Sequence, residues 1–429
     1  MRGLSGLFCS LLLGASAFAG ETPRQPVVPK PIAVKGGLMQ ITGKGMHVGQ
    51  KAFKRREPAD PFVDLQPGGK VALYGTGPRG RRGGGHAYLE FSSLDSMLHG
   101  GKFETKMMKL DPRLDASGAQ PWDLMVHRWP DGQEVMYGAV MEPTGRRKSE
   151  PKWPDDNWTR RVYAFVKDKN GTWQIHGKPL FNEVTDKTKP TMIGHAYGHH
   201  FKAIERDTPS GKTKETWLFH EEVSREIDTP QGKRLVTELF ARKMLDPFTA
   251  SPEKVLILGA GNPPVFGQRA NGDYLVEGPR PFEATVGTER MHFVTFSAAD
   301  FANDRYDIHF AWRRGDGIGA YTPMTTHGEL TRYADKLKDR YKLSWVGRAH
   351  VIEKPDGSLY AVFHAVNKQI RPEVIYDGKQ NDDLETFRRN VYVVPLKITP
   401  GNDGVPVIEL VDDPHHETGD AALAIGKGE

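Results

Sequence analysis

Residues 122–141 read WDLMVHRWPDGQEVMYGAVM: an extended stretch, a Pro-Asp-Gly turn, and a second strand rich in large apolar side chains. Residues 160–168, RRVYAFVKD, add a segment in which aromatic and branched residues alternate with others. Such alternation is typical of half-buried strands, and the glycine supplies the backbone angles that a hairpin turn needs. This stretch therefore predicts an antiparallel hairpin followed by a further strand.

The same pattern recurs in four other parts of the chain, at residues 60–76, 198–223, 277–298 and 349–366. A matching aromatic position is occupied by Tyr74, Tyr137, Phe219, Phe293 and Phe363. Sheets that cannot bury both faces alone stack around a common axis. We therefore expect an all-β, five-bladed β-propeller with four-stranded antiparallel blades. Two β-sandwiches with turns at a similar spacing are the alternative.

One segment does not follow the repeat. Leu330, Tyr333, Leu337 and Tyr341 recur at helical spacing. They predict one short inserted helix before the fifth blade, either packed on the propeller or lying over its site as a lid.

The first residues resemble a secretory signal peptide over residues 1–19. Arg2 precedes an apolar run at residues 7–13, and Ala17-Phe18-Ala19 forms an A-x-A cleavage site. We expect export to a bacterial periplasm or secretion. The mature chain, 20–429, is predicted to be a single propeller domain, with an N-terminal extension over 20–55 and a disordered tail over 415–429.

Composition excludes several classes of partner. The 59 Lys and Arg residues against 54 Asp and Glu give a net charge of only +5, and the basic residues form no long runs, so no nucleic-acid partner is expected. No segment is apolar for long enough to span a membrane. Cys9, the only cysteine, lies in the signal peptide, so no disulfide partner is expected.

Acidic and histidine residues recur at the start of each predicted innermost strand. Asp60, Asp123, His199, Glu277 and His350 lie 13 to 20 residues before the aromatic column. Acidic residues are rare in strands, and buried carboxylates are costly unless they are paired. Their convergence on the axis predicts a site, although solvated side chains lining a water-filled channel are the alternative.

Two carboxyl groups with different duties can cleave a glycosidic bond. One donates a proton to the leaving oxygen, and the other accepts a proton from the attacking water. Asp60 and Glu277 come from the first and fourth blades and would face each other across the axis. Such a placement favours a wide gap that admits a water, and hence an inverting mechanism.

Five short motifs follow one another in register with the repeat: ADPFV at 59–63, SLD at 93–95, PWDL at 121–124, VEGP at 276–279 and GRAH at 347–350. In this order they resemble the five-bladed propeller glycosidases of glycoside hydrolase family 43, which include arabinanases, β-xylosidases and α-arabinofuranosidases. The resemblance implies that Asp60 is the general base and Glu277 the general acid. It implies no required cofactor, and a structural calcium ion near the axis beside His350.

One departure from the family pattern lies in the third blade. The family carries a third carboxylate at the start of that blade, which tunes the pKa of the acid, but residues 193–200 read IGHAYGHH without an acid. Either Asp123 supplies this charge, or the substrate or chemistry differs, or the protein only binds.

The remaining candidate site residues are assigned to binding a carbohydrate. They are Trp122, Asp123, His199, Arg280, Arg348 and His350, with no metal ligand among them. A metal centre built on His195, His199, His200 and His350 is a weaker alternative.

The sequence thus predicts an exported glycoside hydrolase-like protein. The main alternative is a catalytically silent propeller that binds a glycan or a cell-envelope partner. Neutralisation of the carboxylates by Arg280 or Arg348 would favour that alternative.

Overall fold

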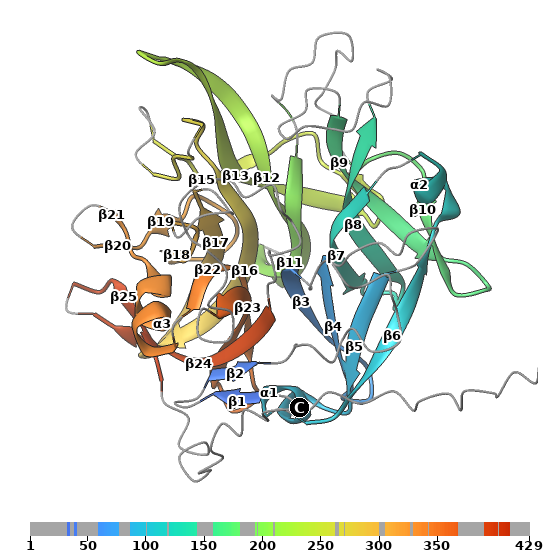
Figure 1. The fold of residues 1–429 in the computed structure, drawn as a ribbon, viewed down its shortest axis with the longest axis horizontal. Helices are drawn as coiled ribbons and strands as arrows, with labels where there is room; N and C mark the ends of the chain where they lie inside the picture. Colours follow the sequence, from blue (N-terminus) through green and yellow to red (C-terminus); the bar gives the residue numbers. More distant parts are fainter. Residues whose placement is uncertain are drawn as a thin grey trace, which may run out of the picture.

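The computed structural model describes residues 32–34, 38–40, 59–76, 86–99, 101–117, 120–143, 158–180, 194, 196–208, 211–261, 266–269, 271–299, 305–326, 329–341, 343–367, 390–401 and 403–411. The predicted signal peptide and the predicted C-terminal tail lie outside the described residues. The described strands form five successive antiparallel units, which follow one another around the molecule (Figure 1).

The first two units share one sheet. Unit one consists of β3 (Ala59–Leu65), β4 (Val71–Thr76), β5 (His86–Phe91) and β6 (Phe103–Leu110). Unit two consists of β7 (Gln120–Arg128), β8 (Glu134–Pro143), β9 (Trp158–Lys167) and β10 (Thr172–His176). Their outermost strands, β6 and β10, pair in parallel and join the two units.

Unit three has the longest strands. It consists of β11 (Ala196–Thr208), β12 (Gly211–Thr229), β13 (Gly232–Asp246), β14 (Thr249–Ala250) and β15 (Val255–Leu258). Both β14 and β15 pair with β13. The hairpin of β12 and β13 projects beyond the rest of the described molecule (Figure 1).

Units four and five complete the sequence of sheets. Unit four consists of β16 (Val276–Val286), β17 (Glu289–Ala298), β18 (Asp307–Arg313) and β19 (Thr322–Pro323). A separate small pair follows, formed by β20 (Thr325–Thr326) and β21 (Glu329–Leu330). Unit five consists of β22 (Leu343–Glu353), β23 (Leu359–Asn367), β24 (Asn390–Pro400) and β25 (Pro406–Leu410). Two strands of the N-terminal extension, β1 (Ile32–Val34) and β2 (Leu38–Gln40), extend this sheet through β24.

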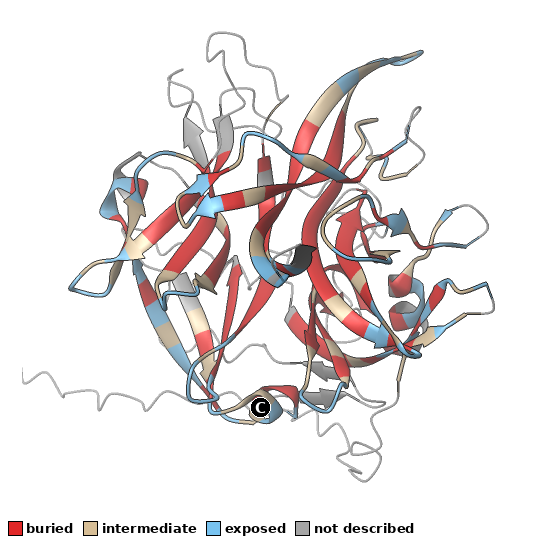
Figure 2. Ribbon diagram, turned by 180° about the vertical axis from the view of Figure 1, so that it is seen from behind, coloured by how far each residue is buried: buried red, intermediate tan, exposed pale blue. Residues whose placement is uncertain are grey.

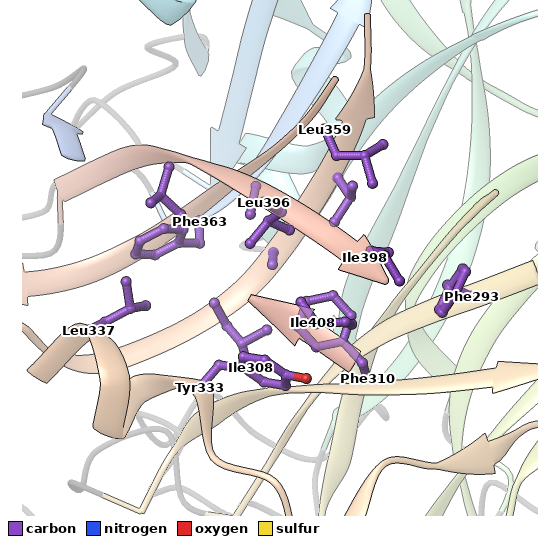
Figure 3. Close-up of a cluster of buried hydrophobic side chains, with 14 of the residues drawn as sticks. Phe293, Ile308, Phe310, Tyr333, Leu337, Leu359, Phe363, Leu396, Ile398 and Ile408 are labelled. Atoms are coloured by element: carbon purple, nitrogen blue, oxygen red, sulfur yellow. The ribbon is translucent and has the colours of Figure 1, made fainter. Parts of the chain in front are cut away.

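The hydrophobic core lies in the seams between units. One cluster joins units one, two and three, another joins three and four, a third joins four and five, and a fourth joins five and one. Buried segments accordingly run along the strands of every unit (Figure 2), and Phe293, Phe310 and Phe363 lie in the seam of units four and five (Figure 3). Two β-sandwiches would each enclose a core of their own, whereas these clusters close a ring.

The described residues contain three short helices rather than the single one expected. They are α1 (Leu94–Leu98), α2 (Pro112–Ser117) and α3 (Tyr333–Tyr341). The predicted helix is α3, and Tyr333, Leu337 and Tyr341 are buried in the seam of units four and five, so it packs into the core (Figure 3). Sequence periodicity missed α1 and α2 because each is less than two turns long. No helix in the described ranges is long and apolar enough to cross a membrane.

The innermost strand of every unit contains a β-bulge at the same place. The strand register shifts between residues 59 and 62, 122 and 125, 197 and 200, 277 and 280, and 347 and 350. The first residue inside each bulge has a positive φ between 51° and 65°; these residues are Asp60, Asp123, Gly198, Gly278 and Arg348. Side-chain-bearing residues rarely adopt this conformation, and a bulge of this kind re-aims the side chain.

Candidate active site

One acidic residue from each of units one to four lies beside Arg348, which is on β22 of unit five. Its Nε lies 3.3 Å from Asp60 Oδ1, and its Nη1 lies 3.2 Å from Asp123 Oδ2. The same Nη1 lies 3.5 Å from Glu221 Oε2 on β12, and Nη2 lies 3.6 Å from Glu277 Oε2 on β16. Burial alone would lower the pKa of Arg348, but the surrounding carboxylates raise it well above its ordinary value, so the side chain is held as a cation.

A second buried arginine holds Asp123. Arg280 Nη2 donates to Asp123 Oδ1 at 2.6 Å, while the other carboxylate oxygen accepts from Arg348 at 3.2 Å. Asp123 is 3 % exposed and Arg280 is 1 % exposed. A carboxylate held between two guanidinium groups in this way is not placed to touch a bound molecule.

Asp60 and Glu277 retain some solvent exposure. The Asp60 side chain is 16 % exposed and the Glu277 side chain 10 % exposed. The Asp60 backbone N–H donates to His364 Nδ1 at 3.0 Å, which holds the bulge from β23. The Tyr306 hydroxyl donates to Glu277 Oε1, and the rings of Tyr306 and His364 are stacked with their centroids 6.1 Å apart. One aromatic pair therefore supports the backbone of Asp60 and the carboxyl group of Glu277.

Glu221 is a residue of this site that sequence reasoning missed. Its carboxylate accepts from the backbone N–H of Gly278 and faces Arg348, and its side chain is fully buried. Burial raises the pKa of Glu221 well above its usual range, with the charge of Glu277 adding to the rise and Arg348 opposing it. A signal was present in the sequence, since Glu221 and Glu222 interrupt an apolar run in the middle of a strand.

The structure corrects the predicted column of axial residues. The equivalent bulge position is held by Asp60 and Asp123 as expected, but by Gly198, Gly278 and Arg348 in the last three units. His199 and Glu277 each lie one residue away from it, and His350 lies two residues beyond it. The predicted aromatic position is also wrong in units four and five. The residues that end the bulges there pair with Thr295 and Val362, not with Phe293 and Phe363.

The predicted histidines lie close to the charged residues of the site, and His200 Nδ1 is 3.3 Å from Arg280 Nη1. His350 stacks on Phe62 at 5.1 Å between ring centroids, and its Nδ1 accepts from the Val63 N–H at 3.0 Å. His200 meets both rings edge-on. Burial, with the charges of Arg280 and Lys202 adding to it, lowers the pKa of His350 to about 3. Burial also lowers the pKa of His199 to about 4 and that of His200 well below its usual range. These imidazoles are neutral; His199 and His200 are buried, whereas His350 keeps some solvent exposure.

The metal alternative receives no support from the described part of the chain. There, no group of three or more His, Cys, Asp or Glu side chains is arranged to hold a metal ion. His195 lies outside the described residues. Trp122, a predicted binding residue, is half-buried and directly precedes the unit-two bulge.

Comparison by sequence returns no match. No protein family model matches the chain, and no curated protein matches it.

Comparison with solved structures places the fold. A thermostable family-43 glycoside hydrolase is similar with a TM-score of 0.53 and 16 % identity, covering 83 % of this chain and 94 % of that one. An α-L-arabinofuranosidase from Lactobacillus brevis is similar with a TM-score of 0.54 and 16 % identity, covering 81 % and 93 %. An endo-1,4-β-xylanase from Bacteroides thetaiotaomicron is similar with a TM-score of 0.50 and 15 % identity, covering 84 % and 97 %. The chain thus has the all-β propeller fold of family-43 glycoside hydrolases, as the sequence predicted.

Proposed function

We propose that the protein hydrolyses a glycosidic bond in a poly- or oligosaccharide, with Asp60 as general base and Glu277 as general acid. The observation that carries this proposal is the difference in exposure among the four carboxyl groups around Arg348. Asp60 and Glu277 are 16 % and 10 % exposed, whereas Asp123 and Glu221 are 3 % and 0 % exposed. Only the first two can meet a sugar and a water.

The proposed mechanism is inverting. Asp60 Oδ1 and Glu277 Oε2 lie 3.3 Å and 3.6 Å from two nitrogens of the same guanidinium, so both carboxyl groups face one site. Inversion requires that they stand about 6.5–9.5 Å apart, with a water between Asp60 and the sugar. The water gives its proton to Asp60 and attacks the anomeric carbon, while Glu277 protonates the oxygen that leaves.

The geometry also indicates which oxygen of Glu277 would carry the proton. Oε1 accepts the hydrogen bond of the Tyr306 hydroxyl. Oε2 lies 3.6 Å from Arg348 Nη2, longer than a hydrogen bond. Oε2 is therefore the oxygen from which a proton can pass to a leaving group.

A hydrolysis screen tests this proposal. The purified protein is incubated with a panel of aryl glycosides and polysaccharides, alongside Glu277→Gln, Asp60→Asn and the control Glu283→Gln. Glu283 is also on β16 but faces Lys202 and Arg290 at 3.6 and 3.5 Å. We expect losses of about 100-fold or more in kcat for the first two variants and little change for the control. Unchanged turnover in Glu277→Gln would remove that residue from the acid role.

A second function is favoured by Arg348 itself. Its guanidinium stands within ion-pair distance of both Asp60 and Glu277, and this neutralisation fits a propeller that binds a glycan without cleaving it. Binding of a panel glycan with no turnover, retained in Glu277→Gln, would select this function over hydrolysis.

We also propose that the protein acts outside the cytoplasm, because residues 1–19 resemble a secretory signal peptide. Fractionation of cells that express the full chain tests this, with the protein expected in the periplasm or medium and shortened by about 19 residues at its N-terminus. Retention of the uncleaved chain in the cytoplasm would contradict it.

A further inference from the structure

The first residue of the unit-three bulge is a glycine, whereas the first residues of the bulges in units one and two are aspartates. Gly198 has a φ of 60°, close to the 51° and 54° of Asp60 and Asp123. Asp therefore fits this backbone conformation in the same protein. A Cβ placed on Gly198 would fall on the carboxylate of Glu221 and come within 2.8 Å of Arg348 Nη1. The place of a side chain at position 198 is occupied by Glu221.

Glu221 reaches this place from the neighbouring strand. It lies on β12 opposite Tyr197 of β11, directly before the bulge. Because residue 198 is a glycine, the space beside it is open to the Glu221 carboxylate. Glu222, the next residue, points to the opposite face of the strand and pairs with Lys254 at 2.7 Å.

We propose that Glu221 is the unit-three carboxyl of the site and acts as a positioning residue for Arg348 and for the peptide between Glu277 and Gly278. Its consequence for catalysis rests on the proposed hydrolysis. Its Oε2 accepts from the Gly278 N–H and faces Arg348 Nη1 at 3.5 Å. The side chain is fully buried and cannot touch a substrate, so it acts through these two neighbours.

The arrangement explains how the acidic residue expected in the third unit is supplied. The carboxyl is present, but the chain delivers it from the second strand rather than from the innermost one. Removing it would release Arg348 toward Asp60, Asp123 and Glu277 and free the Gly278 N–H beside the proposed acid. Misplacement of a reacting group by about 1 Å can cost about 100-fold in rate.

A double-variant cycle tests the proposal. Glu221→Ala, Gly198→Asp and the combined variant are compared with wild type by their thermal unfolding midpoints. Glu222→Gln serves as a control from the same strand. Gly198→Asp alone should lower the midpoint, because the new side chain meets Glu221. The combined variant should unfold at a higher temperature than either single variant, because the new carboxylate replaces the old one. Effects that simply add would overturn the proposal.

Turnover gives the second readout. If wild type hydrolyses a glycoside, Glu221→Ala should lose about 100-fold in kcat with a smaller change in KM. The combined variant should recover most of that loss, and Glu222→Gln should keep the wild-type kcat. Loss without recovery would show that Glu221 has no positioning role at this place. If wild type turns over no glycoside, the hydrolysis proposal fails, while the unfolding cycle still decides whether Glu221 occupies the unit-three position.

Discussion

Arg348 is the residue on which the other site residues depend. It stands within 3.6 Å of four carboxyl groups that come from four different units. A second guanidinium, that of Arg280, pairs with Asp123, one of these four carboxyl groups. A buried charge that loses its partner strongly destabilises the folded protein.

Arg348→Met is expected to destabilise the protein by about 3–5 kcal/mol, because it leaves buried carboxylates without their cation. Chemical denaturation measures the change. The control Arg314→Met removes an exposed arginine that pairs with Glu289 at 3.1 Å, and it should change stability by no more than about 0.5 kcal/mol. A cost for Arg348→Met no greater than that of the control would show that the four carboxyls do not need this cation.

Glu221 predicts a dependence of stability on pH. Its pKa is raised in the folded protein above the unfolded value, so the folded state holds a proton that the unfolded state releases. The contribution to stability is complete below the unfolded pKa and declines as pH rises toward the folded pKa. The groups facing Glu221 are Asp123, Glu277 and Arg348.

Glu221→Gln should remove this decline, so that the variant gains stability relative to wild type as pH rises above about 4.5. Urea denaturation at a series of pH values measures the difference. Parallel curves for the two proteins across that range would contradict the raised pKa.

At the scale of the element, the β-bulges decide where the site residues lie. Gly278 has a φ of 65° and lies against the Arg348 side chain, whereas Gly287 has a φ of 64° in a turn with no close neighbour. An alanine at either position meets the same backbone strain, which costs of the order of 1 kcal/mol. Only an alanine at 278 also displaces Arg348.

Gly278→Ala should therefore destabilise the protein more than Gly287→Ala, and only the former should impair the site. Thermal unfolding of the two variants measures the first difference, and turnover or glycan binding measures the second. Equal costs would mean that the close approach of Gly278 to Arg348 is unimportant.

The bulges also explain what the sequence could and could not predict. Hairpin patterns located the innermost strands, and Asp60, Asp123 and Arg348 could be named because they lie on those strands. The count of residues back from an aromatic position failed in units three to five, because the turns differ in length and a bulge adds residues that no pattern shows. The position of Glu221 in the site could not be predicted, because no sequence pattern shows that its carboxylate fills the space beside Gly198.

At the scale of the whole molecule, the units share their cores. Each hydrophobic cluster spans at least two neighbouring units, and the clusters follow one another around the ring. A unit removed from its neighbours would expose both faces of its sheet. The ring should accordingly be stable only when it is closed.

Unfolding of the full chain should thus be a single transition. Far-UV circular dichroism and tryptophan fluorescence should give the same midpoint in urea, because the loss of one seam exposes the next unit. Two separate transitions would show that some units fold independently of the ring.

The acid role of Glu277 is tested most directly by the dependence of rate on the leaving group. For the sugar that wild type cleaves, kcat/KM is measured with a dinitrophenyl leaving group and with a poor alkyl leaving group, in wild type and in Glu277→Ala. A dinitrophenolate needs no proton to leave, so the variant should keep most of its rate on that substrate and lose about 100-fold or more on the other. Equal losses on both substrates would contradict the assignment of Glu277 as the proton donor.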